Sequence, residues 1–190
     1  MKKRTAFIGA ILSLIPLGQP LLIKTGVVLS TSSFMISLPE KVNAETSSFY
    51  FNRAYEKAEK GDHYGAISDF TKAIEIYPSE VAYYNRGISK FEIKDYYGAI
   101  SDYTKAIEIY PTESAYYNSG IAKTALKDHY GAISDYTKAI EINPKKFKAY
   151  ANRGLAKEKI GDLKGACSDW RQTESLTPNT PAAKWVRDKC

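Results

Sequence analysis

The sequence predicts an all-α fold, a solenoid of four helix-turn-helix units closed by a C-terminal capping helix. The first observation behind this prediction is a repeat. Residues 65–78, 98–111 and 131–144 read GAISDFTKAIEIYP, GAISDYTKAIEIYP and GAISDYTKAIEINP, and residues 165–178 are a degenerate fourth copy. The copies follow one another at intervals of 33, 33 and 34 residues. A fixed period of this length is typical of solenoids, whose units bury their apolar faces only against their neighbours.

The second observation is the helical spacing of apolar residues within a unit. In the first copy they fall at i, i+1, i+4, i+7, i+8 and i+11, the stripe of an amphipathic helix, and are Ala66, Ile67, Phe70, Ala73, Ile74 and Tyr77. Pro78 ends that helix. Residues 48–60 carry an upstream stripe that consists of Tyr50, Ala54 and Ala58. Because Gly61 and Asp62 supply a turn and an N-cap between the stripes, each unit is predicted to be helix, turn, helix.

Within the second unit, aromatic, small and proline residues stand at fixed offsets: Tyr83, Gly87, Ala99, Tyr103, Ala106 and Pro111. This pattern resembles the tetratricopeptide repeat, a helix pair of about 34 residues. The resemblance covers residues 47–180 and implies a right-handed superhelical solenoid. Its four repeats would be 47–79, 80–112, 113–146 and 147–180, with residues 181–190 as the capping helix.

Three slots depart from the family pattern. The residue before the glycine slot, usually Leu, is Arg53, Arg86, Ser119 and Arg153. The later Tyr is replaced by Lys57, Lys90, Lys123 and Lys157. The glycine between the helices becomes Lys94 and Lys127 in the middle units, and we expect both at positive φ, at a cost of about 1 kcal/mol each.

The first 44 residues are different in kind from the repeats. Three basic residues, Lys2, Lys3 and Arg4, precede an apolar run at 6–23. A second apolar run leads to a sequence that ends at Ala44 and that an export peptidase could cleave. We interpret residues 1–44 as a signal peptide cleaved after Ala44, with an uncleaved N-terminal membrane anchor as the alternative. Either interpretation predicts export across the cytoplasmic membrane, to the periplasm or its equivalent, and membrane contact only through residues 1–44.

The charge of the chain does not favour nucleic acid as a partner. The full sequence has a formal net charge of +6, but residues 45–190 carry 22 basic and 20 acidic side chains. The remaining charges alternate in sign, as in Asp69, Lys72 and Glu75 of the first copy. We expect them to form a solvated outer face of weak ion pairs.

The two cysteines raise the hypothesis of a disulfide. Cys167 occupies a slot that holds Ile in the other units, and Cys190 lies on the predicted capping helix. In an oxidising compartment the two residues could pair and pin this helix, contributing roughly 3 kcal/mol. The alternative is a buried apolar Cys167 and a frayed Cys190.

Neither catalysis nor a metal or other cofactor is predicted. The only histidines, His63 and His129, occupy the same slot two units apart, on the order of 20 Å from each other. No phosphate-binding loop, metal-ligand spacing or nucleophile elbow is present in the sequence. We therefore expect a protein that is not an enzyme.

The resemblance implies that the first helix of each pair lines the concave face of the superhelix. The residues expected to project into this groove are Phe51, Asn52, Tyr55, Tyr84, Asn85, Ile88, Tyr117, Asn118, Ile121, Asn152 and Leu155. Asn offers a donor and an acceptor to a peptide backbone, and Tyr and Phe offer contact area at low entropic cost. The Asn residues could equally tie neighbouring helices together.

These residues predict an adaptor or assembly factor that binds an extended segment of another protein. The slots where the family's chaperone-tail binders carry Lys or Arg hold Phe51, Tyr84 and Tyr117, which disfavours an acidic C-terminal ligand. The alternative is a self-associating structural or scaffold protein of the cell envelope, because near-identical units offer matching surfaces.

Overall fold

The computed structural model describes residues 31–178 and 180–190, with side chains from Ala44 onward. Within these residues the secondary structure is entirely helical: α1 (Thr31–Glu59), α2 (His63–Ile76), α3 (Glu80–Glu92), α4 (Tyr96–Ile109), α5 (Glu113–Ala125), α6 (His129–Ile142), α7 (Phe147–Lys159), α8 (Leu163–Leu176) and α9 (Pro181–Lys189). The chain divides into Met1–Pro39 and Glu40–Cys190, and the description below concerns the second unit.

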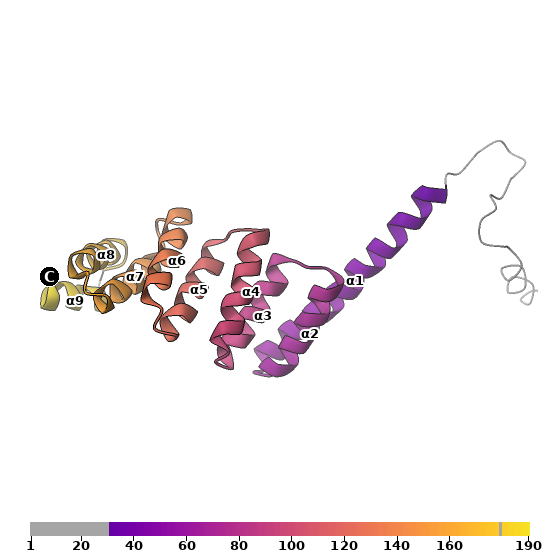
Figure 1. Ribbon diagram of the computed structural model, residues 1–190, viewed down its shortest axis with the longest axis horizontal. Helices are drawn as coiled ribbons and strands as arrows, with labels where there is room; N and C mark the ends of the chain where they lie inside the picture. The colour runs from indigo at the N-terminus through magenta and orange to yellow at the C-terminus, as the bar shows by residue number, and fades with distance from the viewer. Residues whose placement is uncertain (1–30, 179) are drawn as a thin grey trace, which may run out of the picture. The chain divides into compact units, whose positions relative to one another are not determined.

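The helices of Glu40–Cys190 pack in chain order (Figure 1). Each of α3–α8 contacts the helix before and the helix after it, and the first helices of neighbouring pairs also meet, α3 with α5 and α5 with α7. The pairs α1–α2, α3–α4, α5–α6 and α7–α8 are called the first to fourth repeats below. The predicted all-α solenoid of four helix pairs and a capping helix is confirmed.

Local chemistry sets the ends of the helices. The second helix of every repeat begins at an Asp N-cap whose carboxylate accepts a hydrogen bond from a backbone N–H at 2.9 Å; these caps are Asp62, Asp95, Asp128 and Asp162. In the turn before this cap, Gly61 and Gly161 have φ of 81° and 86°. Lys94 and Lys127 take the same place with φ of 65° and 62°, which confirms the expected positive φ.

Small residues in the first helices allow an aromatic ring of the second helix to pack closely. A Cβ on Gly120 would lie 2.6 Å from Cε1 of Tyr136, so no larger residue fits this slot without movement. Gly87 stands in the same relation to Tyr103, at 2.7 Å. In the first repeat the slot is held by Ala54, fully buried in a cluster with Phe70. These contacts hold the two helices of each pair together.

The expectation of a fully solvated charged face on the second helices is wrong for one aspartate per repeat. Asp69 and Asp102 are 1% and 2% exposed, and the equivalent Asp135 and Asp169 are also buried. Each accepts hydrogen bonds or ion pairs from the first helix of its own repeat. The partners are Arg53 and Lys57, Arg86 and Lys90, Ser119 and Lys123, and Arg153 and Lys157, the residues that depart from the family pattern.

The charges further along the second helices do lie in solvent. Lys105 pairs with Glu108 at 2.7 Å and Lys138 with Glu141 at 2.8 Å, and all four side chains are more than half exposed. Pairs of this kind contribute little to stability. The outer-face interpretation therefore holds for these positions and fails for the buried aspartates.

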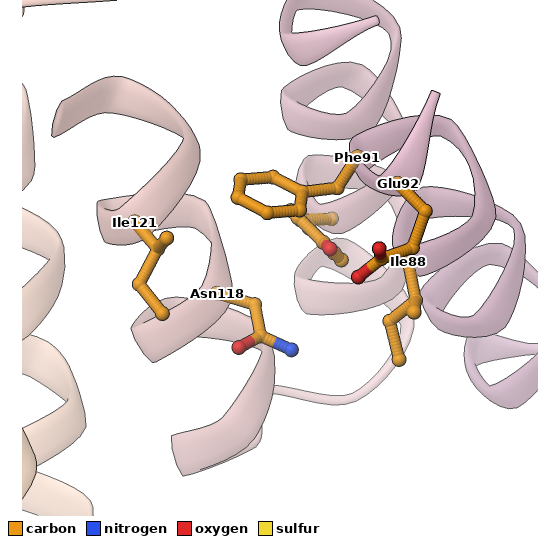
Figure 2. Close-up of a pocket in the computed structure, with 6 residues that line it drawn as sticks. Ile88, Phe91, Glu92, Asn118 and Ile121 are labelled. Atoms are coloured by element: carbon orange, nitrogen blue, oxygen red, sulfur yellow. The ribbon is translucent and has the colours of Figure 1, made fainter. Parts of the chain in front are cut away.

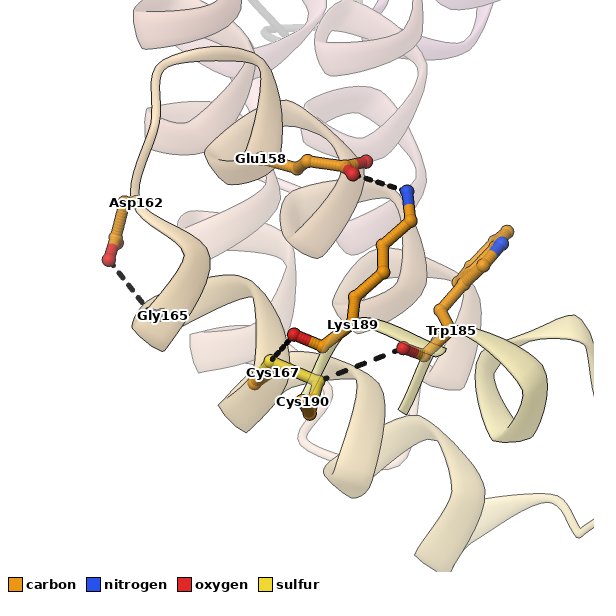
Figure 3. Close-up of a disulfide and its surroundings, with 7 residues drawn as sticks. All are labelled: Glu158, Asp162, Gly165, Cys167, Trp185, Lys189 and Cys190. Atoms are coloured by element: carbon orange, nitrogen blue, oxygen red, sulfur yellow. Dashed lines mark hydrogen bonds and ion pairs between the residues drawn. A yellow bond between two sulfur atoms is a disulfide. The ribbon is translucent and has the colours of Figure 1, made fainter. Parts of the chain in front are cut away.

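Helix α9 covers the C-terminal end of the stack and is joined to α8 by a disulfide between Cys167 and Cys190, with an S–S distance of 2.08 Å (Figure 3). Ala182 is buried in the cluster that contains Trp170, and the ring of Trp185 lies 5.4 Å from that of Trp170. Lys189 forms an ion pair with Glu158 of α7. The helix thus gives the last repeat an apolar partner in place of a further repeat.

The predicted targeting segment lies mostly outside the described residues. The predicted cleavage site after Ala44 falls within α1, which begins upstream of residue 48, the start expected from the apolar stripe. No helix among the described residues is both long and apolar enough to cross a membrane. Cleavage, anchoring and export remain predictions.

The buried carboxylate of Asp69 predicts acid sensitivity. Hydrogen bonds from Arg53, with those from Lys57, hold the pKa of Asp69 well below its ordinary value despite burial. A carboxyl with a lowered folded-state pKa stabilises the fold above its unfolded pKa, about 4, and this contribution declines as the pH falls below that value. We expect the free energy of unfolding, from urea titrations between about pH 7 and 2.5, to fall below about pH 4.

The matched control is Asp69→Asn, which keeps the shape of the side chain and removes its titration. This variant is expected to be less stable at neutral pH and to lose less further stability between about pH 4 and 2.5 than the wild-type chain. Identical pH dependence of the two proteins would contradict this assignment.

Candidate functional site

Two similar hollows lie between the first helices of successive repeats. The first has a volume of about 260 Å³, and its lining consists of Ile88, Phe91 and Glu92 of α3, Tyr103 of α4, and Asn118 and Ile121 of α5. Figure 2 shows the α3 residues facing Asn118 and Ile121 on α5, the first helix of the next repeat. The hollow is therefore built between repeats, not within one.

The second hollow repeats the first one unit further along the chain. Its volume is about 320 Å³, and its lining consists of Ile121, Thr124 and Ala125 of α5, Tyr136 of α6, and Asn152 and Leu155 of α7. Ile121 lines both hollows, so the two are adjacent. Together they form a groove with an apolar floor and one Asn per step, which we call the α3–α5–α7 groove.

The asparagines of this groove also tie neighbouring repeats. Asn118 donates from Nδ2 to the hydroxyl oxygen of Tyr84 at 2.9 Å, and Asn152 donates to that of Tyr117 at 3.2 Å. Asn85 has no such partner, because the equivalent residue of the first repeat is Phe51, and it donates to the Val81 carbonyl at 2.8 Å. Since the ties use Nδ2, the side-chain oxygens of Asn118 and Asn152 are the acceptors offered to a ligand.

Tyr84 and Tyr117 line neither hollow and instead pack on neighbouring rings. The ring of Tyr84 lies 5.9 Å from that of Tyr103, and Tyr117 lies 5.9 Å from Tyr136. Burial raises the pKa of the Tyr84 and Tyr117 hydroxyls above the ordinary value, and it raises the pKa of Tyr136 to about 12. All of these hydroxyls therefore stay protonated at neutral pH and can act as hydrogen-bond donors or acceptors.

The predicted residues of the first repeat lie elsewhere. Phe51 and Asn52 line a different hollow of about 520 Å³ against the start of α3, with Tyr77 and Val81 among its other residues. Phe51 also packs edge-on to Phe70 at 5.5 Å, and Tyr55 is exposed. Of the eleven predicted groove residues, the α3–α5–α7 groove thus brings together Ile88, Asn118, Ile121, Asn152 and Leu155.

Some lining residues were not predicted. Phe91 and Glu92 lie three and four positions after Ile88, and Thr124 and Ala125 lie three and four positions after Ile121. Residues at these spacings share a helix face, so helix periodicity could have placed these four residues in the groove as well. Glu92 also places a carboxylate at the rim of the first hollow.

No metal site is evident beside the groove. Among the described residues, no group of three His, Cys, Asp or Glu side chains is placed to hold a metal ion. His63 and His129 each lie at the first position of a second helix.

Family models place the repeats within a known family. Models described as tetratricopeptide repeat match residues 47–80, 81–113 and 113–146, which together exceed half of the chain. The chain belongs to the tetratricopeptide repeat family. No curated protein matches the chain at a significant level.

Solved tetratricopeptide repeat structures resemble the chain along most of its length. The first tetratricopeptide repeat domain of Spaghetti (RPAP3), bound to the HSP90 peptide SRMEEVD, is 29% identical with a TM-score of 0.55, and the match covers 57% of this chain and 88% of that one. The crystal structure of MamA is 24% identical with a TM-score of 0.66, over 72% of this chain and 86% of that one. YrrB, described as having an unusual peptide-binding site, is 22% identical with a TM-score of 0.64, over 74% and 78%.

These matches set the general class of function. The tetratricopeptide repeat is in general a non-enzymatic protein-interaction fold, and this chain is a protein-interaction module of that kind. The likeness to MamA and YrrB, below 25% identity, shows the fold alone.

Proposed function

We propose that the chain is an adaptor or assembly factor that binds an extended segment of another protein in the α3–α5–α7 groove. The observation that carries this proposal is the repetition of one hollow along the groove, with Ile121 shared between the two copies. A peptide in extended conformation presents side chains to one face at regular intervals, which suits such a row of hollows. The peptide complex of Spaghetti supports this type of ligand for the fold.

The lining indicates the chemistry of the peptide. Ile88, Phe91 and Ile121 favour apolar side chains, and the side-chain oxygens of Asn118 and Asn152 can accept hydrogen bonds from peptide N–H groups. The carboxylate of Glu92 disfavours an acidic segment at the first hollow. We therefore propose an apolar, neutral or basic segment, in contrast to the acidic peptide bound by Spaghetti.

The direct test is Ile121→Arg, because this residue lines both hollows and is only partly buried. The wild-type chain, immobilised and incubated with the native envelope fraction, is expected to retain a specific partner. Ile121→Arg is expected to retain at least about tenfold less of it, because a charged side chain blocks both hollows. Retained proteins are identified and quantified by mass spectrometry.

The matched control is Ile109→Arg, the same change at an exposed isoleucine of α4 that lines neither hollow. It is expected to retain the partner fully, and circular dichroism should show equal helicity in all three proteins. Equal capture by Ile121→Arg, or no capture by the wild-type chain, would contradict the groove proposal. Concentration-dependent self-association in sedimentation, lost in Ile121→Arg, would favour the scaffold alternative.

We further propose that the repeats act outside the cytoplasmic membrane, after export directed by residues 1–44. The basic and apolar pattern of that segment supports export, and the Cys167–Cys190 disulfide fits an oxidising compartment.

The intact mass of the protein from its native source, measured without reductant, tests this proposal. The expected mass is that of a chain beginning at Glu45 and lighter by two hydrogen atoms than the fully reduced form. A mass that begins at Met1 would favour the uncleaved anchor, and two free thiols would contradict the oxidising compartment.

A further inference from the structure

Two arginines of the solenoid occupy identical sites between repeats. Arg86 binds Asp102 of its own repeat at 2.7 and 2.8 Å, and its Nη1 donates to Thr71 Oγ1 of the preceding repeat at 3.0 Å. Its guanidinium also lies 5.5 Å from the centre of the Tyr83 ring. The site thus has three parts: a carboxylate, a hydroxyl from the preceding repeat and an aromatic ring.

Arg153 repeats this arrangement. It binds Asp169 at 2.7 and 2.9 Å, donates to Thr137 of the preceding repeat at 3.0 Å and lies 5.5 Å from the centre of the Tyr150 ring. The same set of contacts recurs in the second and fourth repeats. It indicates that the carboxylate, the hydroxyl and the aromatic ring together form a binding site for a guanidinium group.

In the third repeat the arginine is replaced by Ser119, while the three groups that would surround it remain. They are Asp135, Thr104 of the preceding repeat and Tyr116. Ser119 and Lys123 both bind Oδ2 of Asp135, at 2.6 Å each. The oxygen that corresponds to the other arginine acceptor, Oδ1, has no such donor among the described residues.

The Asp135 and Thr104 side chains are more exposed to solvent than their counterparts at the two arginine sites. The Asp135 side chain is 12% exposed, against 2–4% for the equivalent aspartates. Thr104 is exposed, whereas Thr71 and Thr137 are half-buried. The hydroxyl of Thr104 donates to the Ile100 carbonyl at 2.8 Å, as those of Thr71 and Thr137 donate to Ile67 and Ile133, so its oxygen is equally able to accept.

We infer that Asp135, Thr104 and Tyr116 form a binding notch for the guanidinium group of an arginine side chain carried by a partner protein. One N–H would bond Asp135 Oδ1, another would bond Thr104 Oγ1, and the planar cation would lie against Tyr116, as Arg86 and Arg153 do at their sites. The charge also fits. The buried aspartates of the second and fourth repeats each hold two cationic side chains, and Asp135 holds one, Lys123.

The notch is distinct from the α3–α5–α7 groove. Ser119 and Ile121 are two positions apart on α5, which places them about 160° apart around the helix axis. A ligand of the notch would lie between α4 and α5 on the side away from the hollows. This binding site is therefore independent of the proposed peptide groove.

The notch is tested by adding Nα-acetyl-arginine amide to the isotope-labelled full chain and recording NMR spectra. We expect saturable shift changes at Thr104, Tyr116 and Asp135 in the millimolar range, a typical strength for so small a ligand. Nα-acetyl-lysine amide and Nα-acetyl-citrulline amide are the matched probes. The first keeps the positive charge but lacks the planar guanidinium, and the second keeps the planar group but lacks the charge. Both are expected to bind at least about tenfold more weakly.

Two variants locate the binding. Ser119→Arg should occupy the notch from within and abolish the saturable shifts, and free L-arginine should compete with the amide for the wild-type site. Thr104→Val removes one acceptor at an exposed position and should weaken binding severalfold even if Ser119→Arg folds poorly. The inference is overturned if the wild-type chain shows no saturable shifts, if the three probes bind equally, or if the shifts persist unchanged in both variants.

Discussion

The buried carboxylate in each repeat is the constraint on which the arrangement of the helices depends. Asp69, Asp102, Asp135 and Asp169 come from the second helices, and each must be neutralised because an isolated charge is costly to bury. The cations come from the first helices, 16 residues earlier in the case of the arginines. The pairing thus fixes how each first helix is rotated against its second helix, and through Arg86 and Arg153 it extends to the preceding repeat.

The junctions between repeats differ because single residues of the near-identical units differ. The junction of the first and second repeats has the Arg86–Thr71 bond but no Tyr–Asn tie, because Phe51 lacks a hydroxyl. The second and third repeats have the Asn118–Tyr84 tie but no arginine bond. The third and fourth repeats have both, together with an ion pair at 2.8 Å between Lys146, the N-cap residue of α7, and Glu113 of α5. A partner arginine in the notch would supply the bond that the middle junction lacks.

The fold could be predicted from the sequence because a 33-residue period, helical stripes and Asp N-caps are all local signals. The burial of one aspartate per repeat could not be predicted in this way. Asp69 and Lys72 are three positions apart, which turns them by about 60° around the helix, enough to place one in the interface and the other in solvent. What decides the difference is a partner on another helix. The groove was predicted only in part: Ile88 and Ile121 follow from the family resemblance, which places the first helices on the concave face, whereas the packing of Tyr84 and Tyr117 on neighbouring rings is a tertiary effect.

Native-state hydrogen exchange of the full chain, followed for single amides, tests most directly whether these polar contacts control the coupling of the repeats. The account predicts that the polar contacts decide, because the α6–α7 junction has the arginine bond and the Lys146–Glu113 ion pair and the α4–α5 junction has neither. Amides that flank α4–α5 should exchange through an opening with a free energy lower by about 2 kcal/mol than amides that flank α6–α7. Equal protection at the two junctions, or earlier opening at α6–α7, would contradict the account.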